Sequence, residues 1–131
     1  LVESKNIANG LKSRLNKLDK DKFKDEINLS SKMVKQSDSL VALFLGKIDK
    51  RQGITRNKES NVQEKIYKAY YYISSRPNGN TITESNLMKH ANNSLNNAVK
   101  LVNAFFIEKW KSYKKEMDKL EYSEFKDVKQ F

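Results

Sequence analysis

The stretch from Thr83 to Leu120 constrains the fold more than any other part of this sequence. It contains no Pro or Gly, and its apolar residues recur mostly at steps of three and four, the period of one α-helical face. They are Leu87, Ala91, Leu95, Ala98, Val102, Phe105, Phe106, Trp110, Tyr113, Met117 and Leu120. At about 1.5 Å per residue, such a helix would be roughly 50 Å long. A lone helix would leave this stripe in water, so the rest of the chain must cover it.

The start of this helix carries a capping signal. Thr81 and Glu84 have the Thr-x-x-Glu spacing of a capping box, and Thr83 is an alternative N-cap. We therefore predict a helix over about 84–120.

Earlier segments of the chain have the same helical period. We predict helices over about 1–27, 31–49 and 61–75. A turn is expected at Asn28–Ser31, because the apolar spacing shifts shortly before it. Residues 121–131 carry aromatic residues without a clear period, and we expect them to fold back as a short tail that seals one end of the molecule.

These segments predict an all-α fold. The chain has 131 residues, which suffice for one domain with a modest core, and its 4 Gly and 1 Pro favour helices over a turn-rich β-sandwich. Short connections make consecutive helices antiparallel. We predict a single domain over 1–131, an up-down-up-down four-helix bundle with a long C-terminal helix.

The cysteine content and the hydropathy of the sequence exclude several kinds of site and segment. The absence of cysteine removes disulfides, thiolate metal ligands and a Cys nucleophile. The longest apolar run, Leu40–Leu45, is far below the ~20 residues that cross a bilayer, so no transmembrane segment is predicted. The sequence begins at Leu1 and contains no signal peptide, which leads us to expect an excised or processed piece of a longer protein.

The chain is basic, with a formal net charge of +10. Most of the excess is Lys, dispersed along nearly every segment, whereas Arg is the usual choice for forked phosphate contacts. Dispersed lysines favour a solubilising surface. The alternative is a Lys-rich module that binds a polyanion, either nucleic acid or an acidic polymer; we do not expect nucleic acid to be the partner.

No catalytic or metal-binding pattern is complete in this sequence. His90 is the only histidine, and one His without cysteine cannot build an ordinary zinc site. The aspartates of 19–25 do not form an EF-hand, because Lys24 and Ser30 hold the places of its Gly and Glu. There is no Gly-x-Ser-x-Gly and no glycine-rich phosphate loop. We predict no enzyme, no catalytic residue, no cofactor and no metal.

Two aromatic clusters allow alternative interpretations. The tyrosines of 67–72, beside Lys65 and Lys68, could stack nucleic-acid bases, but four tyrosines in six helical residues surround the helix, so we expect some rings to be buried in packing. The aromatic residues of 105–113 are expected to form core rather than a partner groove.

Part of the chain resembles a known family. The matching pieces are Gly46, Asp49-Lys50-Arg51-Gln52-Gly53-Ile54, Ser75-Arg76-Pro77, Thr83-Glu84, Val102-Asn103-Ala104-Phe105-Phe106, Trp110, Tyr113 and Ser123-x-Phe125. In order and spacing, residues 38–131 resemble a C-terminal helical segment of large secreted bacterial proteins. Those proteins consist mainly of sortilin-like, BNR-repeat β-propellers, are common in the Bacteroidetes and are often labelled glycosyl hydrolases.

The resemblance implies a setting and a role. The hydrolase label belongs to the propellers, so no active-site residue is carried onto this chain. An extracytoplasmic location is implied, whether periplasmic, outer-membrane-associated or secreted. We expect a non-catalytic accessory domain that packs on the propellers of its parent protein or docks on an envelope protein. Loops on a rigid scaffold often carry contacts, and the candidate docking residues are Arg51, Gln52, Arg56 and Arg76; Arg51 and Arg56 could equally pair within the bundle.

Overall fold

The computed structural model describes residues 1–47, 61–76, 79 and 81–121, and these are helices joined by turns. The helices are α1 (Val2–Leu18), α2 (Lys24–Leu45), α3 (Val62–Ser74), α4 (Ile82–Ala104), the π-helical η1 (Phe105–Trp110) and α5 (Lys111–Met117). The prediction of an all-α bundle with a long final helix is confirmed, because α4, η1 and α5 form one rod of 36 residues. Of the predicted tail, 122–131 lie outside the described residues.

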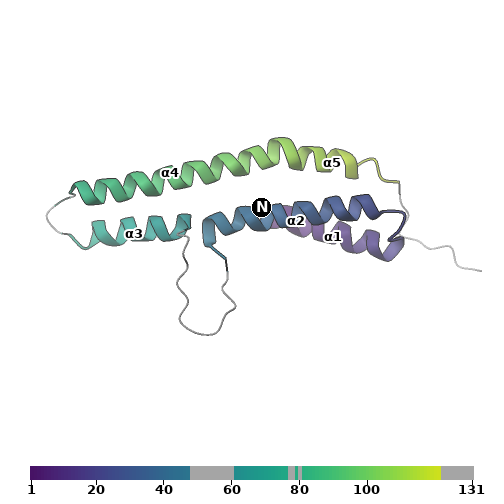
Figure 1. Ribbon diagram of the computed structural model, residues 1–131, viewed down its shortest axis with the longest axis horizontal. Coiled ribbons are helices and arrows are strands. Elements are labelled where there is room, and N and C mark those ends of the chain that lie inside the picture. Colours follow the sequence, from purple (N-terminus) through teal and green to yellow (C-terminus); the bar gives the residue numbers. More distant parts are fainter. Residues whose placement is uncertain (48–60, 77–78, 80, 122–131) are drawn as a thin grey trace, which may run out of the picture.

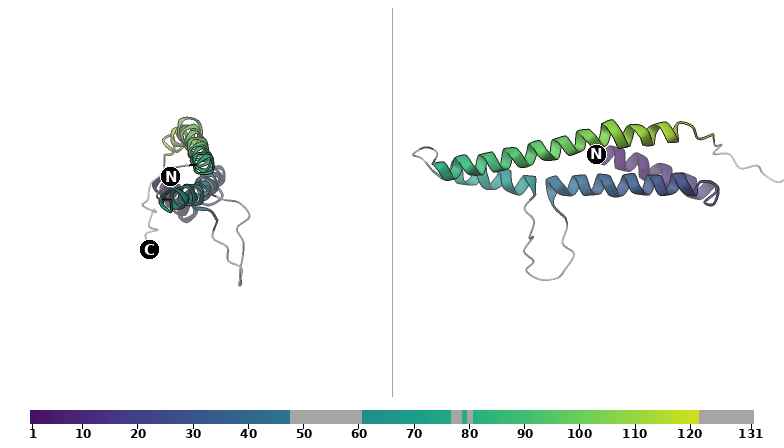
Figure 2. Two further views of the ribbon diagram at one scale, coloured as in Figure 1. Left: turned by 90° about the vertical axis from the view of Figure 1, so that its left-hand side faces the viewer. Right: turned by 45° about the horizontal axis from the view of Figure 1, so that its top comes forward.

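The long rod organises the other helices (Figure 1). α1 and α2 form a hairpin along the half of the rod that contains α5, and α3 lies beside α4 along the other half. α2 and α3 lie end to end in both side views (Figures 1 and 2). The molecule is therefore elongated, with two parts: a body of α1, α2, η1 and α5, and an arm of α3 with residues 82–99 of α4.

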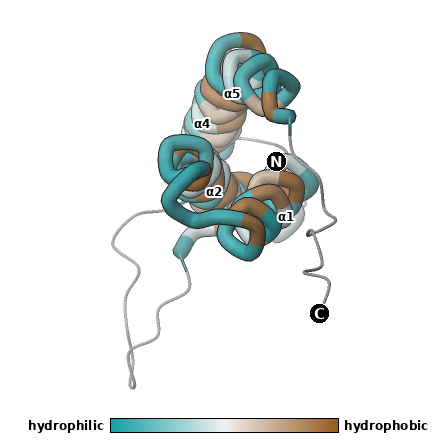
Figure 3. Tube along the Cα trace, turned by 90° about the vertical axis from the view of Figure 1, so that its right-hand side faces the viewer, coloured by the Kyte–Doolittle hydropathy of each residue, from teal (hydrophilic) through white to brown (hydrophobic). Residues whose placement is uncertain are grey.

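The hydrophobic core lies in the body, where α1 and α2 sit side by side beneath the long rod (Figure 3). One buried cluster joins Ala8, Met33, Phe105 and Tyr113, and a second joins Leu15, Phe23 and Ile27. Partly buried apolar residues pack around them: Leu1, Leu11, Leu18, Leu29, Val34, Leu40, Phe106, Trp110, Met117 and Leu120. No residue of α3 or α4 belongs to either cluster in the described part of the chain.

The aromatic residues of 105–113 are core, as predicted. The rings of Phe105 and Phe106 meet edge to face at 5.3 Å, and those of Trp110 and Tyr113 are 5.2 Å apart. The Tyr113 hydroxyl and the buried Ser30 hydroxyl are hydrogen-bonded at 3.0 Å. Burial raises the pKa of Tyr113, and the Ser30 hydrogen bond partly opposes this.

The first turn lies earlier than predicted. For the predicted helices over 1–27 and 31–49, the predicted boundary between them is wrong. α1 ends at Leu18 and α2 begins at Lys24. The Asp19 carboxylate accepts hydrogen bonds from the backbone N–H groups of Asp21 at 3.1 Å and Lys22 at 3.0 Å. This local Asx-type turn ends the helix. The expected turn at Asn28–Ser31 falls inside α2, where Ser30 is needed in the core.

The other helix ends lie near their predicted positions. α3 agrees with the predicted 61–75 within a residue, and the last helix starts at Ile82 with Thr81 as N-cap, the first of the two alternatives. Thr81 and Glu84 form the predicted capping box.

The π-helix keeps one face of the rod buried. Along the rod the buried positions Glu84, Ala91, Ala98 and Phe105 are seven residues apart, whereas the next, Tyr113, follows after eight. Eight residues of regular α-helix would turn Tyr113 about 80° away from Phe105. The wider π-helix absorbs the extra residue, so that Phe105 and Tyr113 both reach the core.

A close contact joins the ends of α2 and α3. α2 ends at Gly46, whose φ is +79°, and a Cβ at this position would lie 2.7 Å from Nδ2 of Asn61. Asn61 is the N-cap of α3, and its Oδ1 accepts a hydrogen bond from the Glu64 N–H at 2.8 Å. Glycine therefore lets the two helices meet end to end.

Candidate docking surface

The predicted docking residues divide between described and undescribed parts of the chain. Arg51, Gln52 and Arg56 fall in 48–60, outside the described residues. Arg76 is described, and its side chain is 53% exposed. Its Nε lies 3.1 Å from a carboxylate oxygen of Glu84, so Arg76 forms an ion pair within the chain, across the turn that joins α3 to α4.

Glu84 anchors that turn. Its side chain is fully buried, and its Oε2 accepts hydrogen bonds from the N–H of Thr81 at 2.8 Å and from the Thr81 hydroxyl. The pKa of Glu84 is lowered, chiefly by the hydrogen bond from the Thr81 hydroxyl. Burial of the carboxylate acts in the opposite direction and raises the pKa. The hydrogen bond from the Thr81 N–H and the positive charge of Arg76 lower it further. Glu84 is therefore held as a carboxylate that closes the end of the arm.

An apolar groove runs along one flank of the arm, at the point where α2 gives way to α3. It has a volume of about 480 Å³ and is lined by Phe44, Leu45, Val62, Gln63, Ile66, Tyr67, Tyr70 and Leu95. Leu45, Tyr67 and Tyr70 are 62%, 69% and 66% exposed. Apart from the hydroxyl groups of its two tyrosines, Gln63 supplies the one polar side chain in this lining, so the groove offers contact area and few hydrogen bonds.

The tyrosines of α3 differ from the expectation that some rings would be buried. Tyr67, Tyr70, Tyr71 and Tyr72 are all exposed, and the buried positions of α3 are Val62 and Ala69. The cause is tertiary: α4 covers only one face of α3, and no third helix covers the rest among the described residues. In the sequence, the high density of tyrosines was the signal for this surface. Helical periodicity alone instead led to the prediction that some of these rings would be buried in the packing of the helices.

The opposite flank of the junction is polar. A smaller hollow of about 360 Å³ is lined by Leu43, Val62, Lys65, His90, Asn93, Ser94, Asn97, Ala98 and Leu101. The Lys65 ammonium donates to the Ser94 hydroxyl at 3.2 Å. His90 is exposed here, and the described residues hold no group of three His, Cys, Asp or Glu side chains that could bind a metal ion.

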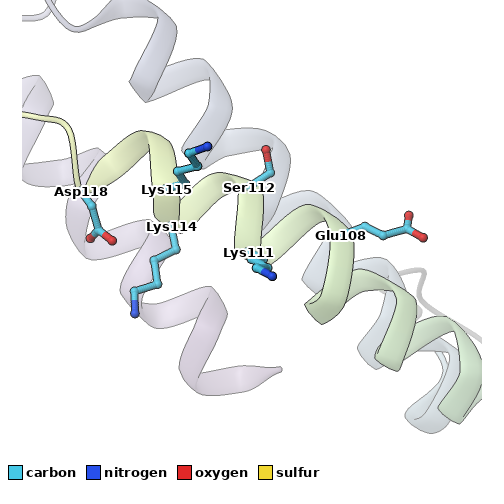
Figure 4. A pocket seen from close by; sticks show the side chains of 6 residues that line it. All are labelled: Glu108, Lys111, Ser112, Lys114, Lys115 and Asp118. Carbon is cyan, nitrogen blue, oxygen red and sulfur yellow. The ribbon is translucent and has the colours of Figure 1, made fainter.

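A third surface, on η1 and α5, carries mixed charge (Figure 4). It is lined by Glu108, Lys111, Ser112, Lys114, Lys115 and Asp118. These side chains project from one rod in different directions, and carboxylates stand among the ammonium groups. Interspersed carboxylates would repel the phosphates of a polyanion, so this patch does not resemble the continuous basic stripe of a nucleic-acid site.

The apolar groove is thus the surface that is best suited to a partner. None of the described helices combines the length with the apolar character that a bilayer crossing requires. Comparisons with protein-family models, with curated proteins and with solved structures found no match to this chain.

Proposed function

We propose that this chain is a non-catalytic docking domain, which packs through its arm on the propeller domains of a larger secreted protein or on another protein of the envelope. The observation that carries the proposal is the apolar groove beside α3, in a part of the molecule whose described residues contribute to neither buried cluster. Exposed apolar patches rimmed by polar residues mark interaction sites. Tyrosine is enriched at such interfaces, because its ring contributes apolar area while its hydroxyl stays hydrated.

The resemblance of residues 38–131 supports the same role. It implies a C-terminal position behind sortilin-like β-propellers and an extracytoplasmic setting. Gly46, Arg76 and Glu84 belong to the resemblance, and here they hold the helix ends that frame the arm. In this proposal the matching residues maintain a docking scaffold, and any glycan chemistry of the parent belongs to the propellers.

The predicted loop residues fit this proposal as additional contacts. The segment 48–60 connects Lys47 to Asn61, and the last residue of α2, Leu45, and the first residue of α3, Val62, both line the groove. Arg51, Gln52 and Arg56 therefore remain predicted contacts for acidic or amide groups of the partner.

Hydrogen exchange in the full-length protein tests the proposal. If the arm docks, amides of α3 should exchange at least about tenfold more slowly in the full-length protein than in the isolated chain, because docking removes local opening. Amides of the Asp19–Phe23 turn should exchange equally in both. Tyr70→Asp should reverse the protection, whereas Tyr72→Asp, about 160° around α3 from Tyr70 and outside the groove lining, should retain it.

Two results would contradict the proposal. One is equal exchange of α3 amides in the isolated chain and the full-length protein. The other is a full-length protein that contains no propeller domain and whose α3 amides also show no slower exchange in the presence of envelope proteins. Turnover of a glycan by the isolated chain would separately overturn its non-catalytic assignment.

A further inference from the structure

The polar hollow, on the flank of the arm opposite the apolar groove, is built from three helices. α3 lies beside α4, and the end of α2 adjoins them (Figure 1). α3 contributes Val62 and Lys65, and α2 contributes Leu43. One face of α4 supplies most of the other side chains, at helical steps of three and four: His90, Asn93, Ser94, Asn97 and Leu101. Polar and apolar side chains thus line the hollow together, and none of the lining residues is Asp or Glu.

Lys65 places a positive charge in this hollow without a carboxylate to balance it. Its side chain is partly buried, and its ammonium group donates a hydrogen bond to the Ser94 hydroxyl at 3.2 Å. No carboxylate in the described part of the chain forms an ion pair with Lys65. Because an ammonium group has three N–H donors, two of them remain for a bound ligand.

The neighbouring side chains add uncharged donors. The Ser94 oxygen accepts a hydrogen bond from Lys65, so the Ser94 O–H can itself donate to a ligand. Asn93 and Asn97 are exposed, and neither side chain hydrogen-bonds to another residue within the described ranges. A carboxylate only accepts hydrogen bonds, and those from a charged donor are stronger than those from neutral donors. The donors around Lys65 therefore match a carboxylate.

The rest of the lining limits the kind of acid. Phosphate recognition commonly uses the forked donors of Arg, whereas this lining contains one Lys, one His and no Arg. Leu43 and Leu101 are 40% and 52% exposed, so a ligand with a hydrocarbon part would remove apolar surface from water. The volume of about 360 Å³ is near the lower end of the range for small-molecule sites. These features favour a small, singly charged acid with a short hydrocarbon chain.

We propose that the polar hollow binds a small organic monocarboxylate. The carboxylate accepts hydrogen bonds from the Lys65 ammonium and the Ser94 hydroxyl, and the hydrocarbon part lies over Leu43 and Leu101. This binding site is separate from the docking role, because the hollow and the apolar groove share only Val62 in their linings. The hollow is lined mostly by exposed residues, so the affinity is expected in about the millimolar range.

The test is an NMR titration of the nitrogen-15-labelled 131-residue chain with sodium butyrate, at constant pH and ionic strength. The side-chain NH₂ groups of Asn93 and Asn97 and the backbone amide of Ser94 should shift saturably, with a Kd of about 10 mM or below. Acetate should bind at least about threefold more weakly, because it covers less apolar surface. Butyramide has a similar shape but no charge, and it should bind at least about tenfold more weakly.

Two lysine variants separate a local contact from general charge attraction. Lys65→Gln should raise the Kd of butyrate at least about tenfold and leave that of butyramide nearly unchanged. Lys68→Gln is the matched control, since it removes the same charge from the same helix. Lys68 is exposed and lies outside the lining, so the Kd of butyrate should stay within about twofold of the wild type. Leu101→Ala should reduce the advantage of butyrate over acetate.

Other results overturn the proposal. The absence of saturable shifts up to about 50 mM butyrate would show that the hollow does not hold a carboxylate. Equal affinities for butyrate and butyramide would show that the charge of the ligand plays no part. Equal losses in Lys65→Gln and Lys68→Gln would identify general charge attraction. Tighter binding of inorganic phosphate than of butyrate at the same amides would identify a phosphate site instead.

Discussion

Glu84 shows how one side chain can order a whole segment. It is buried, binds Thr81 through both the backbone and the hydroxyl, and pairs with Arg76 on the far side of the turn. These contacts favour the carboxylate and lower the pKa of Glu84. The same residue thus caps α4 and ties the end of α3 to it.

The lowered pKa of Glu84 predicts acid sensitivity of the fold. A depressed pKa contributes stability above the usual glutamate value of 4.5, and this contribution is lost as the pH falls through the folded-state pKa. In urea titrations, the free energy of unfolding should therefore decline below about pH 4.5, and Glu84→Gln should decline less steeply. Glu116→Gln, in an exposed ion pair with Lys119, is the control for removing one carboxylate. Overlapping pH profiles of Glu84→Gln and the wild type would refute this role.

Gly46 makes the end-to-end contact of α2 and α3 possible. Its φ of +79° and ψ of 177° belong to a region that is almost restricted to glycine, and a Cβ would press on the capping side chain of Asn61. Gly46→Ala should destabilise the protein by about 1–3 kcal/mol, measured as a lower urea midpoint. Gly10→Ala is a matched control on α1, where a Cβ meets nothing within 4 Å. It should instead stabilise the protein by about 0.5–1 kcal/mol, and equal effects at both positions would contradict this explanation.

At the scale of the element, the long rod keeps a single buried face over its whole length by changing its helix type. Steps of seven carry this face from Glu84 to Phe105, and the π-helix η1 accommodates a step of eight to Tyr113. The extra residue allows both aromatic rings to pack in the body, in one cluster with Ala8 of α1 and Met33 of α2.

This arrangement predicts an unusual tolerance to deletion. Removing the exposed Ile107 makes the step from Phe105 to Tyr113 seven residues, so a regular α-helix would bury both rings. We expect the helix content by circular dichroism to be unchanged and the stability to stay within about 1 kcal/mol of the wild type. Deleting the exposed Asn97 shifts the two halves of the rod by about 100° and should cost at least about 3 kcal/mol. A greater loss from the Ile107 deletion would show that η1 itself is required.

At the scale of the whole molecule, apolar burial is uneven. The clusters around Phe105 and Leu15 lie in the body, whereas the arm buries small residues such as Ala69, Ala91 and Ala98 and leaves its tyrosines exposed. Because apolar burial is the main favourable term in folding, the arm should be the less stable part.

Native-state hydrogen exchange can measure this difference in the isolated chain. Amides of α3 should exchange through local opening, at free energies at least about 2 kcal/mol below those of α2 amides between Ile27 and Ser37. The α2 amides should exchange through global unfolding, with the larger denaturant dependence. A common opening free energy and a common denaturant dependence for both helices would show that the arm and the body unfold as one unit.

Much of the fold could be predicted because its signals are local. Helical periodicity located four helical segments, the Thr81–Glu84 spacing located the start of the last one, and the breakers after Ser74 located the end of α3. The first turn was missed because Asp19 ends α1 through its own side chain, while the apolar pattern runs on through Phe23 and Ile27 into the next helix.

The candidate site was less predictable. Arg76 was predicted as a docking residue, and its ion pair with Glu84 across the turn was not foreseen, because the sequence does not show which side chains meet there. The groove could not be predicted from the sequence, because it depends on which face of α3 is covered by another helix. Sequence spacing defines the faces of a helix but does not say how many neighbours it has.

The sequence by itself determined that this protein is helical, that its final helix is long and amphipathic, and where most helices end, because periodicity and capping act within a few residues. Only the tertiary structure decided that α2 and α3 lie end to end along the long rod of α4, η1 and α5. It also decided that the core forms around Phe105 and Tyr113, and that the tyrosines of α3 face outward. Those outcomes depend on contacts between residues far apart in the chain, where close packing selects among several faces that local chemistry leaves equally possible.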